Sequence, residues 1–222
     1  MLPGPHEKIV YTGESLRFAW QKTKENLGFL IVFWLLYLAL MAFASWALEI
    51  IFPGEGGNET IRQILNWVTT IFLGMGVTKI HLDIVDGKKP SLNDILATLP
   101  YFINFLITST LYTLITIAGF ILLIIPGVIW FYKYLLSPYF VIDKNMDPIA
   151  ALKASAKATR GEKFNLFILT STFPLIIFLG VLALGIGILV AMPVVYLAQA
   201  YAYRRLEERM IEPLTFPTAH AQ

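Results

Sequence analysis

The feature that most constrains this chain is an apolar stretch of 42 residues, Tyr101 to Ile142, in which Lys133 is the one charged residue. A transmembrane helix needs about 20 apolar residues to cross roughly 30 Å of hydrocarbon. The stretch is therefore long enough for two crossings and must turn within itself. Ile125-Pro126-Gly127 is the expected turn, because proline cannot continue the helical hydrogen bonds and glycine tolerates a reversal. This predicts two transmembrane helices, 101–124 and 127–142.

The rest of the chain adds four more predicted helices in the membrane. Gly185-Ile186-Gly187 is expected to divide a second long apolar stretch, and Pro174 and Pro193 are expected to kink the helices on either side of it. The sequence thus predicts an all-α polytopic fold of six transmembrane helices in three hairpins, within a single membrane domain, 1–210, followed by a flexible tail, 211–222. The four additional spans are 27–48, 61–82, 164–184 and 187–203.

Composition supports a membrane protein. The chain is 57% hydrophobic and 14% charged, against roughly 25% charged in ordinary soluble domains. It has no cysteine, which excludes disulfides, thiolate metal sites and a cysteine nucleophile. The net charge of +2 gives no indication of a nucleic-acid partner. No cleavable signal peptide is expected, because the charged N-terminal segment precedes an apolar stretch too long for a signal core.

The distribution of basic residues predicts the orientation. The loop from Glu49 to Thr60 contains three acidic residues and no basic one. Nearly all basic residues lie on the other side of the predicted membrane; Arg62 and Lys133 are the exceptions. By the positive-inside rule that side is cytoplasmic. We therefore expect a multi-pass protein of the plasma (inner) membrane with both termini in the cytoplasm.

A short amphipathic segment precedes each predicted hairpin, which indicates three copies of one unit. The three segments are Ser15 to Asn26, a segment opened by a capping box at Ser91 and Asp94, and one from Asp147-Pro148 to Gly161. Leu16, Arg17, Ala19, Thr23 and Lys24 align without gaps on Leu152, Lys153, Ser155, Thr159 and Arg160. In the third segment we expect an apolar stripe of Ile149, Leu152 and Ala156, and a basic face of Lys153, Lys157 and Arg160.

Two interpretations of these basic faces stay open. They bind anionic lipid head groups at the membrane surface, or they only connect the spans, as the positive-inside rule alone would produce. The candidate ligand or head-group residues are Lys133, Lys153, Lys157 and Arg160.

Three groups of residues carry a family resemblance. They are Asp86-Gly87-Lys88-Lys89-Pro90-Ser91-Leu92 with Asp94, the region from Ile125-Pro126-Gly127 to Arg160-Gly161-Glu162-Lys163, and Leu184-Gly185-Ile186-Gly187 with Pro193 and Tyr201-Ala202-Tyr203. From about residue 15 to 207 the chain resembles a broad family of uncharacterised six-helix prokaryotic membrane proteins. That family is related to the membrane domain fused to some glycerophosphoryl diester phosphodiesterases. The resemblance implies an architecture and a membrane-lipid setting; the phosphodiesterase catalytic domain has no counterpart here.

Lys133 lies within the fourth predicted span, ten residues before Asp143. At ~1.5 Å per residue its Cα would lie roughly 15 Å from the cytoplasmic end of a straight helix. An ionisable group at that depth costs at least a few kcal/mol. Either Lys133 lines a polar cavity that binds an anionic group, or a short, tilted helix and neighbouring hydroxyl or tyrosine side chains satisfy it.

Nothing in the sequence supports catalysis. No acidic residue lies in the middle of a predicted span, and no nucleophile motif or phosphate-binding loop is present. His81 and Asp83 lack a third ligand, so we expect no metal site and no cofactor; a polar cluster around them would be the only home for an enzyme. The threonines of the third span, Thr108 among them, are expected to serve packing.

The leading hypothesis is a non-enzymatic membrane component that binds or organises lipid, or that supports a membrane-protein partner or a homo-oligomer. The alternative is a small transporter or permease for a lipid-like or anionic solute, with a cavity around Lys133. The basic surface segments favour the first hypothesis, and a hydrated cavity that reaches Lys133 would favour the second.

Overall fold

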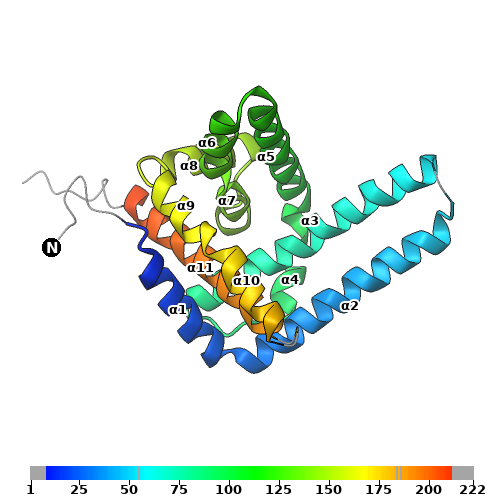
Figure 1. Ribbon diagram of the computed structural model, residues 1–222, viewed down its shortest axis with the longest axis horizontal. Helices are drawn as coiled ribbons and strands as arrows, with labels where there is room; N and C mark the ends of the chain where they lie inside the picture. Colours follow the sequence, from blue (N-terminus) through cyan, green and yellow to red (C-terminus); the bar gives the residue numbers. More distant parts are fainter. Residues whose placement is uncertain (1–8, 55, 184, 186, 212–222) are drawn as a thin grey trace, which may run out of the picture.

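The computed structural model describes residues 9–54, 56–183, 185 and 187–211, and these residues form helices and connecting turns without a strand. The predicted all-α fold is confirmed (Figure 1). The predicted tail lies outside the described residues except for Ile211, the last residue of α11. The helices are α1 (Thr12–Glu25), α2 (Leu27–Ile51), α3 (Gly57–Val85), α4 (Asn93–Leu96), the 3-10 helix η1 (Leu99–Tyr101), α5 (Phe102–Leu122), α6 (Ile124–Tyr134), α7 (Ser137–Lys144), α8 (Pro148–Ala158), α9 (Lys163–Ser171), α10 (Phe173–Leu182) and α11 (Ile188–Ile211).

Five helical segments of the described chain are long and apolar enough to cross a membrane: Leu27–Ile51, Gly57–Val85, Asn93–Leu122, Ile124–Lys144 and Lys163–Leu182. The sixth predicted span falls in α11. The apolar part of this helix ends at Arg204 and is shorter than the ~20 residues that span a bilayer. The structure therefore supports a membrane protein, while six spans and three hairpins stay a prediction.

The turn between α5 and α6 lies earlier than expected. Leu123 adopts an extended conformation (φ −169°, ψ 157°) between the two helices. Pro126 follows within the first turn of α6, where its missing N–H costs no helical hydrogen bond. Gly127 serves a close helix contact instead of the turn, because a Cβ there would lie 2.6 Å from the ring of Phe120.

Two predicted spans are interrupted. The fourth changes from α6 to α7 at Leu135 and Leu136. The fifth is interrupted at Thr172, where α9 gives way to α10, just before Pro174; proline has no N–H to donate to the preceding turn. The expected turn at residues 185–187 is described only in part: Gly185 has a φ of +74°, which favours glycine. Pro193 lies inside α11, as predicted.

Each short helix packs on the last helix of a neighbouring unit. Helix α4 contacts α3, α8 contacts α7, and α1 contacts α11 (Figure 1). Because α1 belongs to the first repeat and α11 to the last, these contacts close the chain into a ring. The centre of the ring is the core: Ile80 and Ile84 of α3, Phe140 of α7, and Leu197 and Leu206 of α11 are all buried.

The aligned helices α1 and α8 are buried at matching positions. Ala19 and Thr23 of α1 correspond to Ser155 of α8 and to Thr159, which directly follows α8, and all four are fully buried. In both segments the threonine hydroxyl donates to the carbonyl four residues earlier, at 2.8 Å for Thr23 and 2.9 Å for Thr159. The repeat inferred from the sequence is therefore also visible in how α1 and α8 pack.

Large apolar side chains remain exposed on the outer helices. The α2–α3 pair extends away from the rest of the molecule (Figure 1), and Phe43 and Trp46 of α2 are more than half exposed. Ile121 and Ile124, at the turn between α5 and α6, are 79% and 74% exposed. Such surfaces are typical of helices that face lipid.

Candidate functional site

Helix α8 positions the backbone around Lys133. The Ser155 hydroxyl donates to the Lys133 carbonyl oxygen at 2.9 Å, and the Leu136 N–H donates to Ser155 Oγ at 3.2 Å. The Thr159 hydroxyl, which donates to the Ser155 carbonyl oxygen, also lies 3.3 Å from the Lys133 carbonyl oxygen. These bonds satisfy backbone groups that the break between α6 and α7 leaves free. Lys133 therefore lies against α8, and the straight helix that would place it at mid-membrane is not present.

The buried face of α8 differs from the expected apolar stripe. Leu152 is buried as predicted, but Ile149 is 56% exposed and Ala156 is only partly buried. Ser155 and Thr159 occupy the buried face instead, together with Ala151 and Ala158. The apolar periodicity of the sequence did not predict that Ser155 and Thr159 are buried, because their hydroxyls are polar. Their burial depends on backbone groups supplied by α6 and α7.

A cavity of about 470 Å³ lies between α6, α8 and the start of α9. We call it the basic cavity; its lining residues are Ile129, Trp130, Lys133, Ala156, Lys157, Arg160 and Lys163. Four of the seven are basic and none is acidic. Its volume lies within the ~300–1,000 Å³ typical of ligand pockets.

The four basic side chains of this cavity have no carboxylate partner among the described residues. None of Lys133, Lys157, Arg160 and Lys163 forms an ion pair there, and the one close interaction of the Lys133 ammonium is with the ring of Tyr134, at 5.0 Å from Nζ to the ring centre. Like charges repel more strongly near low-dielectric walls than in water. An anion bound between them would relieve this repulsion, so the arrangement favours binding of an anionic group.

The structure brings together three of the four sequence candidates. Lys133, Lys157 and Arg160 line the basic cavity, whereas Lys153 is exposed elsewhere on α8. The sequence analysis missed Lys163 as a site residue. The three-residue spacing of Lys157, Arg160 and Lys163 was the available signal, but Gly161 (φ +85°) turns the chain between α8 and α9, and the spacing alone did not reveal where Lys163 would lie.

An apolar groove adjoins the basic cavity. Its volume is about 290 Å³, and its lining residues are Val128, Ile129, Tyr132, Lys163, Phe164 and Phe167. It shares Ile129 and Lys163 with the basic cavity. The Tyr132 hydroxyl is held at 2.9 Å from Thr170 Oγ1, which fixes this ring between α6 and α9. Polar and apolar surfaces therefore adjoin at Ile129 and Lys163.

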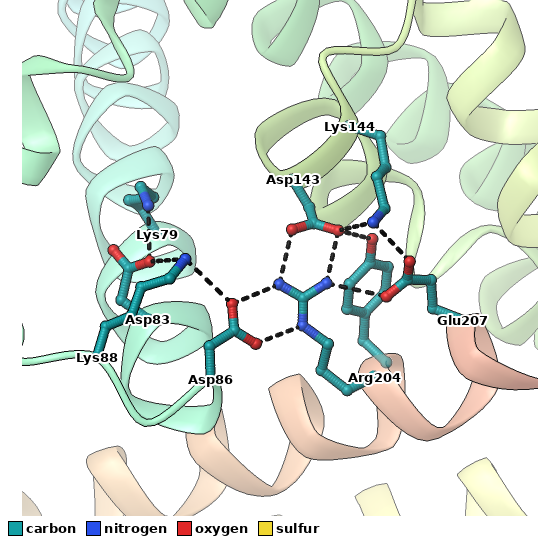
Figure 2. A network of polar contacts seen from close by, with 9 residues as sticks. Lys79, Asp83, Asp86, Lys88, Asp143, Lys144, Arg204 and Glu207 are labelled. Carbon is teal, nitrogen blue, oxygen red and sulfur yellow. Dashed lines mark hydrogen bonds and ion pairs between the residues drawn. The ribbon is translucent and has the colours of Figure 1, made fainter.

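A second cluster of charges lies where α3, α7 and α11 meet (Figure 2). Arg204 of α11 is surrounded by Asp86, Asp143 and Glu207. Its Nε and Nη2 donate to Asp86 at 2.7 and 2.8 Å, and its Nη1 and Nη2 donate to Asp143 at 2.6 and 2.7 Å. Nη1 also donates to Glu207 at 2.9 Å. All five N–H groups of the guanidinium are thus used.

Further pairs surround this arginine cluster. Lys144 contacts Asp143 and Glu207, the Tyr203 hydroxyl donates to Asp143 at 2.8 Å, and Asp83 accepts from Lys79 at 2.7 Å (Figure 2). With Lys88, which contacts Asp83 and Asp86, four acidic side chains balance four basic ones, which indicates a structural junction between helices.

Lys88 lies at the exposed edge of the same cluster. Partial burial opposes its charged form, but the carboxylates of Asp83 and Asp86 outweigh that effect and raise the pKa of Lys88 above its ordinary value. Arg204 was not predicted from the sequence as the partner of Asp86 and Asp143. No local pattern links residues so far apart in the chain.

His81 and Asp83 lie in different surroundings. His81 is fully buried, its Nδ1 is 2.7 Å from the Val77 carbonyl oxygen, and the rings of Trp34 and Tyr196 pack around it. Asp83 belongs to the charged junction described above. Within the described residues, no group of three His, Asp or Glu side chains converges on a point that could hold a metal ion. His81 and Asp83 therefore belong to two different environments, one aromatic and one charged.

The chain is similar to mycobacterial proteins. No family model and no solved structure matches the chain. The chain is 28% identical over 156 residues to "Uncharacterized protein Rv2560" of Mycobacterium tuberculosis (strain ATCC 25618 / H37Rv), and equally to "Uncharacterized protein Mb2590" of Mycobacterium bovis. The match covers 69% of this chain and 47% of each relative. The chain thus spans about half the length of the curated relatives it matches.

Proposed function

We propose that this chain is a non-enzymatic, multi-pass membrane protein that binds anionic lipid head groups in the basic cavity. The observation that carries the proposal is a cavity with four basic side chains and no acidic one. The exposed apolar helices support a lipid environment beside this cavity, and the family resemblance described above suggests a membrane-lipid setting. Anionic head groups are the commonest anions at the cytoplasmic surface of a membrane.

The proposed topology has six crossings in three hairpins, with α11 as the sixth and both termini in the cytoplasm. Helices α1, α4 and α8 then lie at the cytoplasmic surface. Contact between Lys133 and α8 supports this arrangement. In the proposed topology Lys133 lies near the head groups, where a charge is far less costly than in the hydrocarbon.

The expected strength of binding follows from the number of charges. Each Lys or Arg near an anionic membrane surface contributes about 1 kcal/mol. Four such residues would give about 4 kcal/mol, roughly a thousand-fold preference for an anionic over a neutral head group. Removal of two bases should reduce the affinity about thirty-fold.

The test is the double variant Lys157→Gln/Arg160→Gln. Native mass spectrometry of the protein, titrated with phosphatidylglycerol in a mild detergent, measures the bound lipid. We expect about thirty-fold weaker binding by this variant. The matched control is the double variant Lys24→Gln/Lys153→Gln, which removes the same charge from exposed positions of α1 and α8 outside the cavity. Equal loss in both double variants would show a diffuse charge effect and refute the proposal.

A second candidate function is transport of an anionic or lipid-like solute. The observation in its favour is that the basic cavity reaches Lys133. A transporter would also need an opening toward the other face of the membrane. Uptake of a labelled anionic solute into proteoliposomes, abolished by Lys133→Met, would support transport, whereas lipid binding without uptake would leave the first candidate.

A further inference from the structure

We propose that the basic cavity and the apolar groove form one site for a single anionic glycerophospholipid. The phosphate lies among Lys133, Lys157 and Arg160, and one acyl chain lies along Val128, Tyr132 and Phe167. This inference rests on the proposed function and adds the identity and orientation of the ligand.

The cavity and the groove adjoin each other. They share Ile129 on α6 and Lys163 at the start of α9. A ligand that occupies both would pass beside these two side chains. Lys163 marks the boundary, since it lines both parts.

The polarity of the lining changes from the cavity to the groove. Along α9, the basic Lys163 is followed by Phe164 and, one turn later, by Phe167. Around α6, Val128, Ile129 and Tyr132 line the groove, whereas Ile129, Trp130 and Lys133, each one residue further around the helix, line the basic cavity. On both helices the lining therefore changes from basic in the cavity to apolar in the groove, as a phospholipid changes from phosphate to acyl chain.

The volume of the cavity and the surface of the groove both suit a phospholipid better than a small anion. The cavity of about 470 Å³ would hold on the order of fifteen water molecules at ~30 Å³ each, so a phosphate ion alone would leave most of it to water. A head group with its glycerol would occupy more of the space. The walls of the groove are almost wholly apolar. A soluble anion would gain nothing there, whereas an acyl chain removes that surface from water.

The charge of the cavity also predicts which lipids are excluded. The ammonium of phosphatidylethanolamine would lie among Lys157, Arg160 and Lys163, with no carboxylate lining the cavity to offset the repulsion. We therefore expect phosphatidylglycerol or phosphatidic acid to be preferred over phosphatidylethanolamine by at least ten-fold.

The experiment compares a groove variant with the charge variant. Val128→Phe fills the groove from α6, and Phe167→Ser makes its opposite wall polar; two variants guard against a change that only impairs folding, which size-exclusion chromatography monitors. The matched control is Leu175→Phe, at a position of α10 that is 59% exposed and lies outside the site. Native mass spectrometry measures binding of dioleoyl phosphatidylglycerol, and isothermal titration calorimetry measures binding of glycerol 3-phosphate.

We expect both groove variants to bind phosphatidylglycerol at least ten-fold more weakly, with glycerol 3-phosphate binding and the control unchanged. If only Lys157→Gln/Arg160→Gln loses phosphatidylglycerol, the proposed function stands and the acyl-chain placement is overturned. If glycerol 3-phosphate binds as tightly as phosphatidylglycerol, the site takes a soluble anion and this inference is wrong. If the charge variant retains full binding, the proposed function and the inference both fail.

Discussion

Replacement of Arg204 by methionine should destabilise the protein more than any other single loss of charge. Arg204 has a side chain only 15% exposed, and its partners Asp86, Asp143 and Glu207 are 22%, 13% and 7% exposed. Removal of one partner from a buried ion pair costs about 3–5 kcal/mol, because the remaining charges stay buried without compensation. Lys144, at 2.6 Å from Glu207 and 3.2 Å from Asp143, partly compensates here. We therefore expect the lower end of that range, about 3 kcal/mol.

The assay is reversible unfolding in mixed detergent micelles by increasing amounts of sodium dodecyl sulfate, followed by circular dichroism. Arg204→Lys keeps the charge but has three donors instead of five. It should therefore lower the free energy of unfolding by about 1.5–3 kcal/mol, the value of a hydrogen bond to a charged group. The matched control is Arg205→Gln. Arg205 is 41% exposed and pairs with Glu208 at 3.5 Å, and an exposed pair is worth about 0–1 kcal/mol.

A double-mutant cycle separates the ion pairs from packing. If the carboxylates left behind cause the cost, Asp143→Asn should be less harmful in the Arg204→Met background than in the wild-type chain. Additive losses would mean that the aliphatic part of Arg204 accounts for the effect. An Arg204→Met protein as stable as the wild type would refute the account of the junction.

The remaining predictions concern topology and helix contacts. Because the chain has no cysteine, single cysteines at Glu59 and Lys153 should react with an impermeant maleimide from opposite faces of the membrane; labelling from the same face would contradict the proposed orientation. Gly187→Ala should destabilise the α10–α11 contact by about 1–3 kcal/mol, because its Cβ would lie 2.6 Å from a backbone oxygen. Gly74→Ala, with nothing within 4 Å, should instead stabilise α3 by about 0.5–1 kcal/mol, and detergent unfolding distinguishes the two. Ser155→Ala should cost about 1–3 kcal/mol, since it leaves the Leu136 N–H without its partner; an unchanged unfolding curve would show that water replaces the hydroxyl.

The sequence predicted those features that depend on local patterns. The length of the apolar stretches predicted a helical fold of the membrane type. Asp147-Pro148 and Gly161 predicted the two ends of α8 to within a few residues. The turn between α5 and α6 was predicted a few residues too late, because proline and glycine each occur in more than one structural setting. Pro126 opens a helix as readily as it ends one, and Gly127 is needed where α5 approaches α6.

Contacts between distant residues could not be predicted in the same way. Lys133, Lys157 and Arg160 were candidates because of their charge, but their convergence depends on the hydroxyls of Ser155 and Thr159, which hold α8 against the break after α6. The arginine junction depends on three helices meeting, which no single segment encodes. Residue type therefore indicated what the side chains could bind, and tertiary packing decided which of them lie together.

The basic cavity lies where the internal repeat departs from its own pattern. In the gapless alignment of α1 with α8, the positions of Lys157, Arg160 and Lys163 are Gln21, Lys24 and Leu27. An alignment that places Asp143 on Glu207 puts Leu197, which is fully buried, at the position of Lys133. The first and last repeats thus share the scaffold of this site but lack three of its four charges. The shared positions maintain the ring of helices, whereas the basic residues found in only one copy are not needed for that ring. Their presence in one copy supports the proposed ligand, which would bind once per chain.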